Sequence, residues 1–152
     1  MQLTRYTDYG LRVLTMLAVL PEGRLTSINE ICGSFDLSRN HVNKIVHHLG
    51  KLGWASTKRG KGGGVGLGCP AGAINLAEVV RALESNLAIV ECHSPVCELQ
   101  PVCRLQGILA AAAKAFMDTL GQYTLADLVV APEEITQVLK LMPLNVGQPA
   151  TS

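Results

Sequence analysis

The sequence contains no Asp or Glu from Leu37 to Ala77, although the whole chain carries a net charge of only +1. The basic residues of this segment are Arg39, Lys44, Lys51, Lys58, Arg59 and Lys61. Its net charge is therefore +6, while the rest of the chain, with seven basic and twelve acidic residues, carries −5. Excluding acids over such a length is typical of a polyanion-binding surface and unusual for an ordinary solvated basic face.

A membrane-spanning run is also missing. A transmembrane helix needs about 20 apolar residues, whereas the most apolar stretch, Leu11 to Leu20, is shorter and contains Arg12 and Thr15. The following Pro21–Arg24 lacks the small residues of a signal-peptide cleavage site. We therefore expect a buried amphipathic helix, capped by Thr7 and ending at Leu20, in a cytoplasmic protein that has no membrane partner.

Two short helices joined by a tight turn are predicted next. Ser27 and Glu30 form a capping-box pattern that opens the first helix, and Asp36-Leu37 makes the turn before Ser38 caps the second. The apolar face of the second helix consists of Val42, Ile45, Val46, Leu49 and Leu52. Its other face presents Arg39, Asn40, Asn43, Lys44, His47 and Lys51. This pattern predicts a helix-turn-helix that reads bases, because Arg forks onto guanine and Asn pairs bidentately with adenine.

A basic β-hairpin is predicted directly after the helix-turn-helix. Trp54 to Arg59 forms one strand, Gly60 to Gly64 a turn, and Val65 to Leu67 the return strand. Basic side chains supply positive charge, and the glycines let the backbone approach a phosphate or the minor groove. The expected fold class is mainly α with a small β-hairpin wing, a winged helix-turn-helix. The expected DNA contacts are Ser38, Arg39, Asn40, His41, Asn43, Lys44, Lys58, Arg59, Lys61 and Gly63.

Motifs for nucleotide binding and catalysis are absent. The glycine-rich turn belongs to no GxxxxGK motif followed by Ser or Thr, and no GxGxxG follows a strand and opens a helix. His41, His47 and His48 have no nucleophile pattern nearby. The chain is therefore not expected to be an enzyme, and these histidines are interpreted as part of a DNA-facing helix surface.

Three of the five cysteines lie in one short segment, Cys92, Cys97 and Cys103, with the spacing C-x4-C-x5-C. Pro95 and Pro101 keep this segment out of helix and stiffen it. Three thiolates on one stiff loop form a chelate for a soft metal or an iron–sulfur cluster, and the C-x2-C pairs of most zinc ribbons and fingers are missing. The fourth ligand must come from another residue, another chain or a small molecule.

Other uses of the cysteines stay open at this point. A disulfide with one spare thiol is disfavoured by the odd total of five and by the lack of a secretion signal. A structural zinc site completed by His93 and a set of unliganded thiols are further alternatives, and an iron–sulfur cluster is favoured over all three. Cys32 lies on an apolar helix face and is expected to be a small core residue. Cys69, after the hairpin, is expected to be a surface thiol.

The second half of the chain is predicted to contain two helices and a tail. Asn75 caps the first helix, and the second runs from Leu105 to Leu120, with Gly121 as its C′ residue. The second helix carries an apolar stripe, for which a partner subunit is favoured over packing on the first helix of the chain. The expected domains are a winged helix-turn-helix DNA-binding domain (1–84), a cluster-binding loop (85–104), a dimerisation helix with the following segment (105–130) and a flexible C-terminal tail (131–152). We expect at most two helical turns in this tail, near Glu133 to Leu141.

Five segments of the chain carry a resemblance to a known family. They are Leu3–Arg12, Ser38–His41, Arg59–Gly64, the cysteine triplet and Tyr123–Leu128. On these segments the chain resembles the iron–sulfur winged-helix repressors of bacteria, over residues 1 to 130 or so. Within that family, Ser38–His41 and the C-x4-C-x5-C spacing are most similar to the nitric-oxide-sensing members.

The resemblance implies a homodimeric transcriptional repressor that binds a palindromic operator in double-stranded DNA while it carries a 2Fe–2S or 4Fe–4S cluster. It also implies that Cys92, Cys97 and Cys103 hold the cluster, with Asp8 of the partner subunit as candidate fourth ligand. A carboxylate is a hard, weak ligand for cluster iron and leaves it open to a diatomic gas. Nitric oxide would then release the operator and derepress nitrosative-stress genes. The alternative for Asp8 is a first-turn carboxylate favoured by the helix dipole.

Three other functions compete with this one. The first is an iron–sulfur repressor that senses iron or redox status, the second an iron–sulfur electron carrier, and the third a zinc-stabilised interaction module. The acid-free basic segment and the hairpin argue against the carrier, which has no use for them. A visible absorption spectrum separates a brown iron–sulfur protein from a colourless zinc protein.

Overall fold

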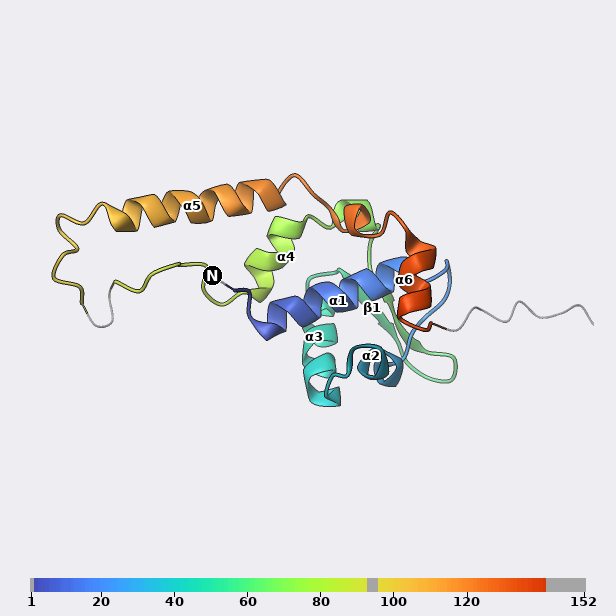
Figure 1. Ribbon diagram of the computed structural model, residues 1–152. Coiled ribbons are helices and arrows are strands. Elements are labelled where there is room, and N and C mark those ends of the chain that lie inside the picture. The colour runs from blue at the N-terminus through green and yellow to red at the C-terminus, as the bar shows by residue number, and fades with distance from the viewer. Residues whose placement is uncertain (1, 93–95, 142–152) are drawn as a thin grey trace, which may run out of the picture.

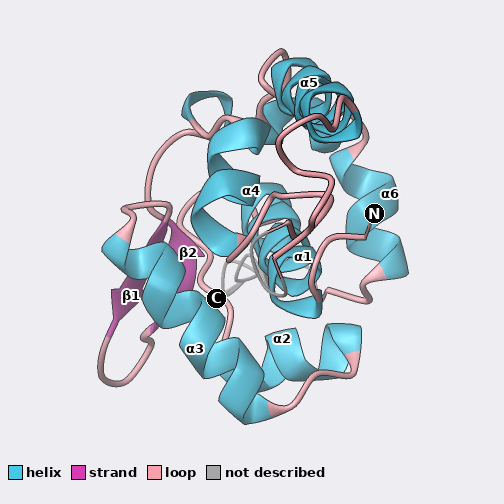
Figure 2. Ribbon diagram, turned by 90° about the vertical axis from the view of Figure 1, so that its left-hand side faces the viewer, coloured by secondary structure: helices cyan, strands magenta, loops and turns pink. Residues whose placement is uncertain are grey.

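The computed structural model describes residues 2–92 and 96–141; residues 1, 93–95 and 142–152 lie outside the description. The helices in the described ranges are α1 (Arg5–Val19), α2 (Ile28–Phe35), α3 (Arg39–Lys51), α4 (Leu76–Leu83), α5 (Leu105–Leu120) and α6 (Pro132–Val138). The other elements in these ranges are two short 3-10 helices, η1 (Ala71–Ala73) and η2 (Leu125–Leu128). There is also an antiparallel hairpin, formed by β1 (Ala55–Lys58) and β2 (Gly64–Leu67). The expected fold class, mainly α with a small hairpin wing, is confirmed (Figure 1, Figure 2).

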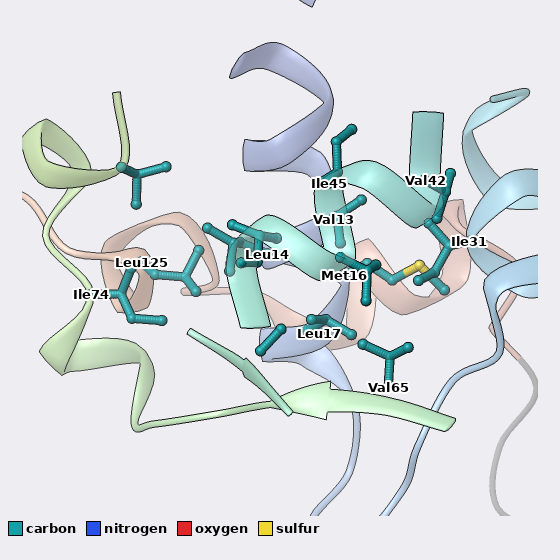
Figure 3. Packing of buried hydrophobic residues seen from close by; sticks show 14 of the residues in the cluster. Val13, Leu14, Met16, Leu17, Ile31, Val42, Ile45, Val65, Ile74 and Leu125 are labelled. Carbon is teal, nitrogen blue, oxygen red and sulfur yellow. The ribbon is translucent and has the colours of Figure 1, made fainter. Parts of the chain in front are cut away.

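The central helix of the fold is α1, against which α3, α4, α6 and the hairpin pack (Figure 1). Its most deeply buried apolar side chains are Val13, Leu14, Met16 and Leu17, each at most 3% exposed. Around them lie Ile31 of α2, Val42 and Ile45 of α3, Val65 of β2, and Ile74 and Leu125 (Figure 3). Burying one large aliphatic side chain stabilises a fold by about 1.5–3 kcal/mol, so this cluster holds the helix-turn-helix and the hairpin on one scaffold.

The start of α1 differs from the prediction. Thr4 is the N-cap and its hydroxyl accepts a hydrogen bond from the backbone N–H of Thr7 at 3.4 Å. Thr7 itself is fully buried inside the first turn, and its hydroxyl donates to the Glu84 carboxylate at 2.6 Å. The prediction that Thr7 caps this helix is therefore wrong, because the Thr7 hydroxyl donates to Glu84 at the end of α4, and the Thr4 hydroxyl is the one that accepts a free N–H of the first turn.

The capping box of α2 is half formed. Ser27 is the N-cap, as predicted, and its hydroxyl accepts from the Glu30 backbone N–H at 3.0 Å. The Glu30 carboxylate, however, accepts from the Thr26 hydroxyl at 2.8 Å and from the Arg24 guanidinium at 2.7 Å. Glu30 thus holds the segment before α2 against the helix. Its carboxylate bonds Thr26 and Arg24 in place of the Ser27 N–H that a complete capping box would use.

The turn between α2 and α3 matches the prediction. Asp36 adopts a left-handed conformation with φ 52°, and the Leu37 N–H donates to the Cys32 carbonyl at 3.0 Å. Ser38 then caps α3 by accepting from the His41 N–H at 3.4 Å. An Asp tolerates this conformation better than most residues do, so the short chain reversal needs no glycine.

The apolar face of α3 is one residue shorter than predicted. Val42, Ile45, Val46 and Leu49 are buried, but Leu52 is 38% exposed. Leu52 is the C-cap of the helix, and the chain leaves it through Gly53 with φ 77°. The helical periodicity therefore ends before Leu52, and including this residue in the apolar face was wrong.

The long helix α5 stands away from the core and lies against α4 (Figure 1). Described along its whole length, it has no buried residue, and the side chains of Leu105 and Ile108 are 55% and 60% exposed. Gly121 is its C-cap with a right-handed φ of −65°, so this glycine does not adopt the positive φ typical of a C′ residue. The exposed apolar residues at the start of α5 are a favourable surface for a partner, whereas Leu109, Phe116 and Leu120 further along are partly buried.

A short helix near the C-terminal end was predicted, and α6 confirms it. Pro132 occupies its first turn, where the missing N–H costs nothing. The helix packs on α1, and Leu141 just beyond it is only 5% exposed. Residues 132–141 of the predicted tail are therefore attached to the core, and 142–152 lie outside the described residues. In the described ranges, no helix is long and apolar enough to cross a membrane.

The crossing of α1 over α4 depends on a glycine. Gly10 is buried, and a Cβ built on it would collide with Cδ1 of Leu83, itself only 5% exposed. We predict that Gly10→Ala destabilises the protein by about 1–3 kcal/mol, the usual cost of overpacking a core, as measured by urea unfolding.

A matched control for this variant is Gly33→Ala on α2. A Cβ there would meet no described atom within 4 Å, and replacing a helical glycine by alanine stabilises by about 0.5–1 kcal/mol. The Gly10→Ala loss should shrink in a Leu83→Ala background, where the clashing methyl is gone. Equal stability of Gly10→Ala and Gly33→Ala would contradict this prediction, because it would show that α1 and α4 can accommodate a side chain at position 10.

Candidate nucleic-acid interface and cysteine loop

The polar face of α3 lies in solvent. All six residues predicted for it are exposed: Arg39, Asn40, Asn43, Lys44, His47 and Lys51. The opposite side of the helix is buried against α1 and α2. The helix therefore projects a row of cationic and amide side chains outward, which is the requirement for a base-reading helix in a major groove.

A groove of about 830 Å³ runs between the start of α2, α3 and the hairpin. It is lined by Ser27, Ile28 and Asn29 of α2, by Arg39, Asn43, His47 and Lys51 of α3, and by Thr57, Lys58 and Arg59 of the hairpin, among others. Figure 2 shows α3 and the two strands side by side. The fold thus brings Arg39 and Asn43 together with Lys58 and Arg59, as the sequence suggested, while Lys61 and Gly63 lie in the turn beyond the groove.

The hairpin turn depends on its glycines. Gly60 and Gly62 have φ values of 95° and 80°, and the Gly63 N–H donates to the Gly60 carbonyl at 2.9 Å. A Cβ on Gly63 would collide with the carbonyl oxygen of Lys58. Gly63 was predicted to let the backbone approach DNA closely. In the folded chain, the turn itself already requires a glycine at this position, because a side chain would not fit.

The hairpin is anchored to the segment before α2. Thr26, 1% exposed, exchanges two backbone hydrogen bonds with Val65 of β2, at 2.9 and 2.7 Å. The strands themselves pair from Ala55 opposite Leu67 to Lys58 opposite Gly64. The basic hairpin is therefore held in a defined position beside the start of α2.

Helix α1 also contacts α3 through two tyrosines. The Tyr6 hydroxyl oxygen lies 3.1 Å from Nδ1 of His48 and 3.4 Å from the Lys44 carbonyl oxygen, and the Tyr9 and His41 rings are 6.3 Å apart. Burial raises the pKa of the Tyr6 phenol, so its hydroxyl stays protonated at neutral pH. His48 was interpreted as DNA-facing surface, but it is half-buried against Tyr6.

The cysteine loop joins α4 to α5 at one end of the molecule (Figure 1). Cys92, Cys97 and Cys103 carry free thiols and are partly exposed, and the Cys97 N–H donates to the Cys92 carbonyl at 3.1 Å. Among the described residues, no three potential metal ligands converge on one point, and His93 lies outside them. Three reduced thiols on one accessible loop nevertheless fit an iron–sulfur cluster by donor chemistry, because thiolates are its usual ligands.

The two remaining cysteines are packed against the core. Cys32 was predicted as a small core residue, and it lies partly buried against the apolar cluster. Cys69 was predicted as a surface thiol, but it is also partly buried against the same cluster. The Gly68 N–H donates to the Trp54 carbonyl at 2.9 Å, which extends the hairpin pairing by one position and places Cys69 directly after it, beside the core.

Asp8, the candidate fourth ligand, lies in the first turn of α1. Its carboxylate makes a two-point ion pair with Arg12, with contacts of 2.8 and 3.0 Å. Both side chains are close to half exposed, and ion pairs in such positions contribute at most about 1 kcal/mol. The pair is thus weak enough for Asp8 to exchange Arg12 for another cation.

A carboxylate that the sequence did not single out ties the end of α4 to the start of α1. Glu84, at the end of α4, accepts hydrogen bonds from the Thr4 N–H at 3.1 Å, the Thr4 hydroxyl at 3.2 Å and the Thr7 hydroxyl at 2.6 Å. It therefore places a negative charge at the N-terminal end of α1, where the helix dipole favours it. Because these partners are about 80 residues apart, no local pattern could have revealed the contact.

Solved structures of bacterial regulators share this fold. The chain is 27% identical to CymR (YrzC), the global cysteine regulator of B. subtilis, over 84% of this chain and 95% of that one, with a TM-score of 0.66. The oxidized form of Staphylococcus aureus CymR matches at 24% identity over 86% and 97% of the two chains (TM-score 0.70). IscR of T. potens matches at 21% over 89% and 90% (TM-score 0.71). These last two likenesses bear on the fold alone.

The family is set by the sequence match. Residues 3–131 match Rrf2, a family described as iron-dependent transcriptional regulators. The match includes the helix-turn-helix, the hairpin, the cysteine loop and α5. Members of this family are DNA-binding transcriptional regulators and not enzymes. The resemblance to winged-helix repressors is thereby confirmed at the level of the family: the chain belongs to the Rrf2 transcriptional regulators.

Proposed function

We propose that this regulator is a homodimeric repressor of the NsrR type, in which an iron–sulfur cluster on the cysteine loop senses nitric oxide. The observation that carries the proposal is the position of three free thiols on the loop between the DNA-binding unit and the exposed helix α5. A change at this loop can therefore act on both the subunit contact and the DNA-binding face. The proposed location is the cytoplasm, where thiols stay reduced.

The DNA side of the proposal rests on the groove beside α3. Arg39 and Asn43, which line the groove, and the exposed Asn40 are assigned to base edges, and the remaining contacts predicted from the sequence to phosphates. In a symmetric dimer the two α3 helices meet half-sites about one helical turn apart, so the operator is palindromic. The exposed side chains of Leu105 and Ile108 on α5 supply the apolar surface that such a dimer buries.

The cluster would be held by Cys92, Cys97 and Cys103, with Asp8 of the partner subunit as the fourth ligand. When bound, an iron–sulfur cluster supplies an iron that reacts with nitric oxide. The protein then has a direct path from this site to the DNA: Asp8 lies on α1 two residues after Tyr6, which contacts α3 at His48. Asp8 would leave Arg12 to hold the cluster, and Tyr6 on the same helical turn is the residue that would carry a change at Asp8 to α3.

A second candidate function is a repressor that senses iron or cluster status. The description of the family as iron-dependent regulators favours it, and the B. subtilis neighbour is a cysteine regulator. An electron carrier or a zinc-stabilised module has less support, because the family consists of transcriptional regulators. Titration of the anaerobic protein with nitric oxide, and separately with an iron chelator, followed by operator binding, separates the two repressor functions.

We predict that Cys92→Ser, Cys97→Ser and Cys103→Ser each abolish cluster binding, because each removes one thiolate from the chelate. The measurement is the iron and sulfide content of anaerobically purified protein, together with its visible absorption. Cys32→Ser and Cys69→Ser serve as controls and keep the cluster, since both thiols lie against the core. Normal iron and sulfide in any triplet variant contradicts the assignment.

Arg39→Ala and Asn40→Ala are expected to lose operator specificity, whereas Lys58→Ala and Lys61→Ala weaken binding to every duplex alike. A base contact is worth about 1–3 kcal/mol of discrimination, and a phosphate contact lowers the salt slope by about 1 per charge. Affinities for operator and random duplexes at several salt concentrations provide the test. Equal losses on both duplexes for all four variants would refute this division of labour.

Nitric oxide or removal of the cluster should lower operator affinity at least about tenfold, equivalent to 1.4 kcal/mol, while the protein stays dimeric. The dimer is expected to persist because its proposed contact, the apolar side of α5, is not altered by changes at the cysteine loop. Light scattering and operator titration of the same samples check both parts. Dissociation into monomers would replace this rearrangement with an assembly switch, and unchanged affinity would remove the sensor function.

A further inference from the structure

Asn29 and Arg39 form a side-chain contact between the two helices of the helix-turn-helix. Arg39 is the first residue of α3, and its Nη1 donates to the Oδ1 of Asn29, the second residue of α2, at 3.1 Å. A guanidinium has only donors, so the Asn29 amide must present its oxygen to Arg39. Both side chains are exposed and both line the groove between α2, α3 and the hairpin.

The Asn29 side of this contact is held by a rigid frame. The neighbouring Ser27 caps α2 through the Glu30 N–H, and Glu30 is in turn held by Thr26 and Arg24 at 2.8 and 2.7 Å. Thr26 is 1% exposed and pairs with β2 through two backbone hydrogen bonds. The acceptor for Arg39 therefore has a defined position relative to both helices and the hairpin.

We propose that Asn29 is a positioning residue that orders the Arg39 guanidinium for base reading, and so contributes to operator specificity without itself contacting a base. The proposal rests on the function assigned above. One of the five guanidinium donors is used by Asn29, and the others stay free for the O6 and N7 acceptors of a guanine. Because a free Arg side chain has many rotamers, one hydrogen bond at its tip removes part of the ordering cost of binding.

Two alternative roles of Asn29 are compatible with its chemistry. Asn29 could contact an adenine directly, since an amide pairs bidentately with that base, or it could serve only as an exposed residue of α2. The first role predicts an effect that does not need Arg39, and the second predicts no effect on specificity. The interdependence of the two side chains is therefore the decisive quantity.

The experiment uses the full-length, anaerobically purified protein and a pool of random DNA duplexes. The wild type selects its preferred sequence from the pool, and Arg39→Ala then identifies the base pair at which discrimination is lost. At this base pair, Asn29→Ala is expected to lower discrimination about two- to tenfold, the range for one side chain that is no longer pre-ordered. In an Arg39→Ala background, Asn29→Ala has no further effect.

Asn29→Asp is the matched variant, because it keeps the acceptor oxygen but adds a negative charge. It retains the base discrimination of the wild type while weakening binding to all duplexes through repulsion of phosphates. A purely structural role for Asn29 would not separate these two variants in this way. Thermal unfolding of all variants checks that stability is unchanged, as expected for an exposed residue.

The outcomes distinguish this inference from the function on which it rests. Loss of discrimination in Asn29→Ala that persists in the Arg39→Ala background means direct base contact and overturns the positioning role. Unchanged discrimination in Asn29→Ala, when Arg39→Ala has lost it, overturns it as well. If the wild type selects no common sequence from the pool, the repressor proposal itself fails, and the role of Asn29 fails with it.

Discussion

The burial of one side of α1 is the constraint on which the rest of the structure depends. Val13, Leu14, Met16 and Leu17 are inaccessible or nearly so, and the helices and hairpin that form the candidate DNA interface all pack around them. A core at native density transmits displacement instead of absorbing it. A shift of α1 is therefore expected to reach α3, which packs on it.

The positive charge that is concentrated in one segment of the sequence is also concentrated on one side of the folded molecule. The segment without acids forms α3 and the hairpin, so its positive charge is concentrated on the side of the molecule that carries the groove. The cysteine loop lies at the far end of α4 and α5. Glu84, at the end of α4, connects that helix to the first turn of α1, and Tyr6 connects the same turn to α3. The cysteine loop and the candidate DNA interface are thus separate regions, and the first turn of α1 lies between them.

Local sequence signals predicted most of the elements correctly, and their failures share one cause. The caps Ser27, Ser38 and Asn75, the turn at Asp36 and the glycine hairpin are local features, and each was found where it was expected. Thr7, Leu52 and Cys69 were misplaced, because tertiary partners or the end of a helix decided their surroundings. A threonine can cap a helix or donate into the core, and the sequence carries no sign of which partner is nearby.

The sequence by itself determined the family, the winged helix-turn-helix, the basic character of the segment that forms α3 and the hairpin, and the cysteine triplet, because these depend on residue types at short spacings. Only the tertiary structure decided which of those residues meet. It joined Arg39 to Asn29, Glu84 to Thr4 and Thr7, and Thr26 to the hairpin. These contacts bridge residues 10 to 80 positions apart, where hydrogen bonding depends on how whole helices pack and no longer on the periodicity of one helix or strand.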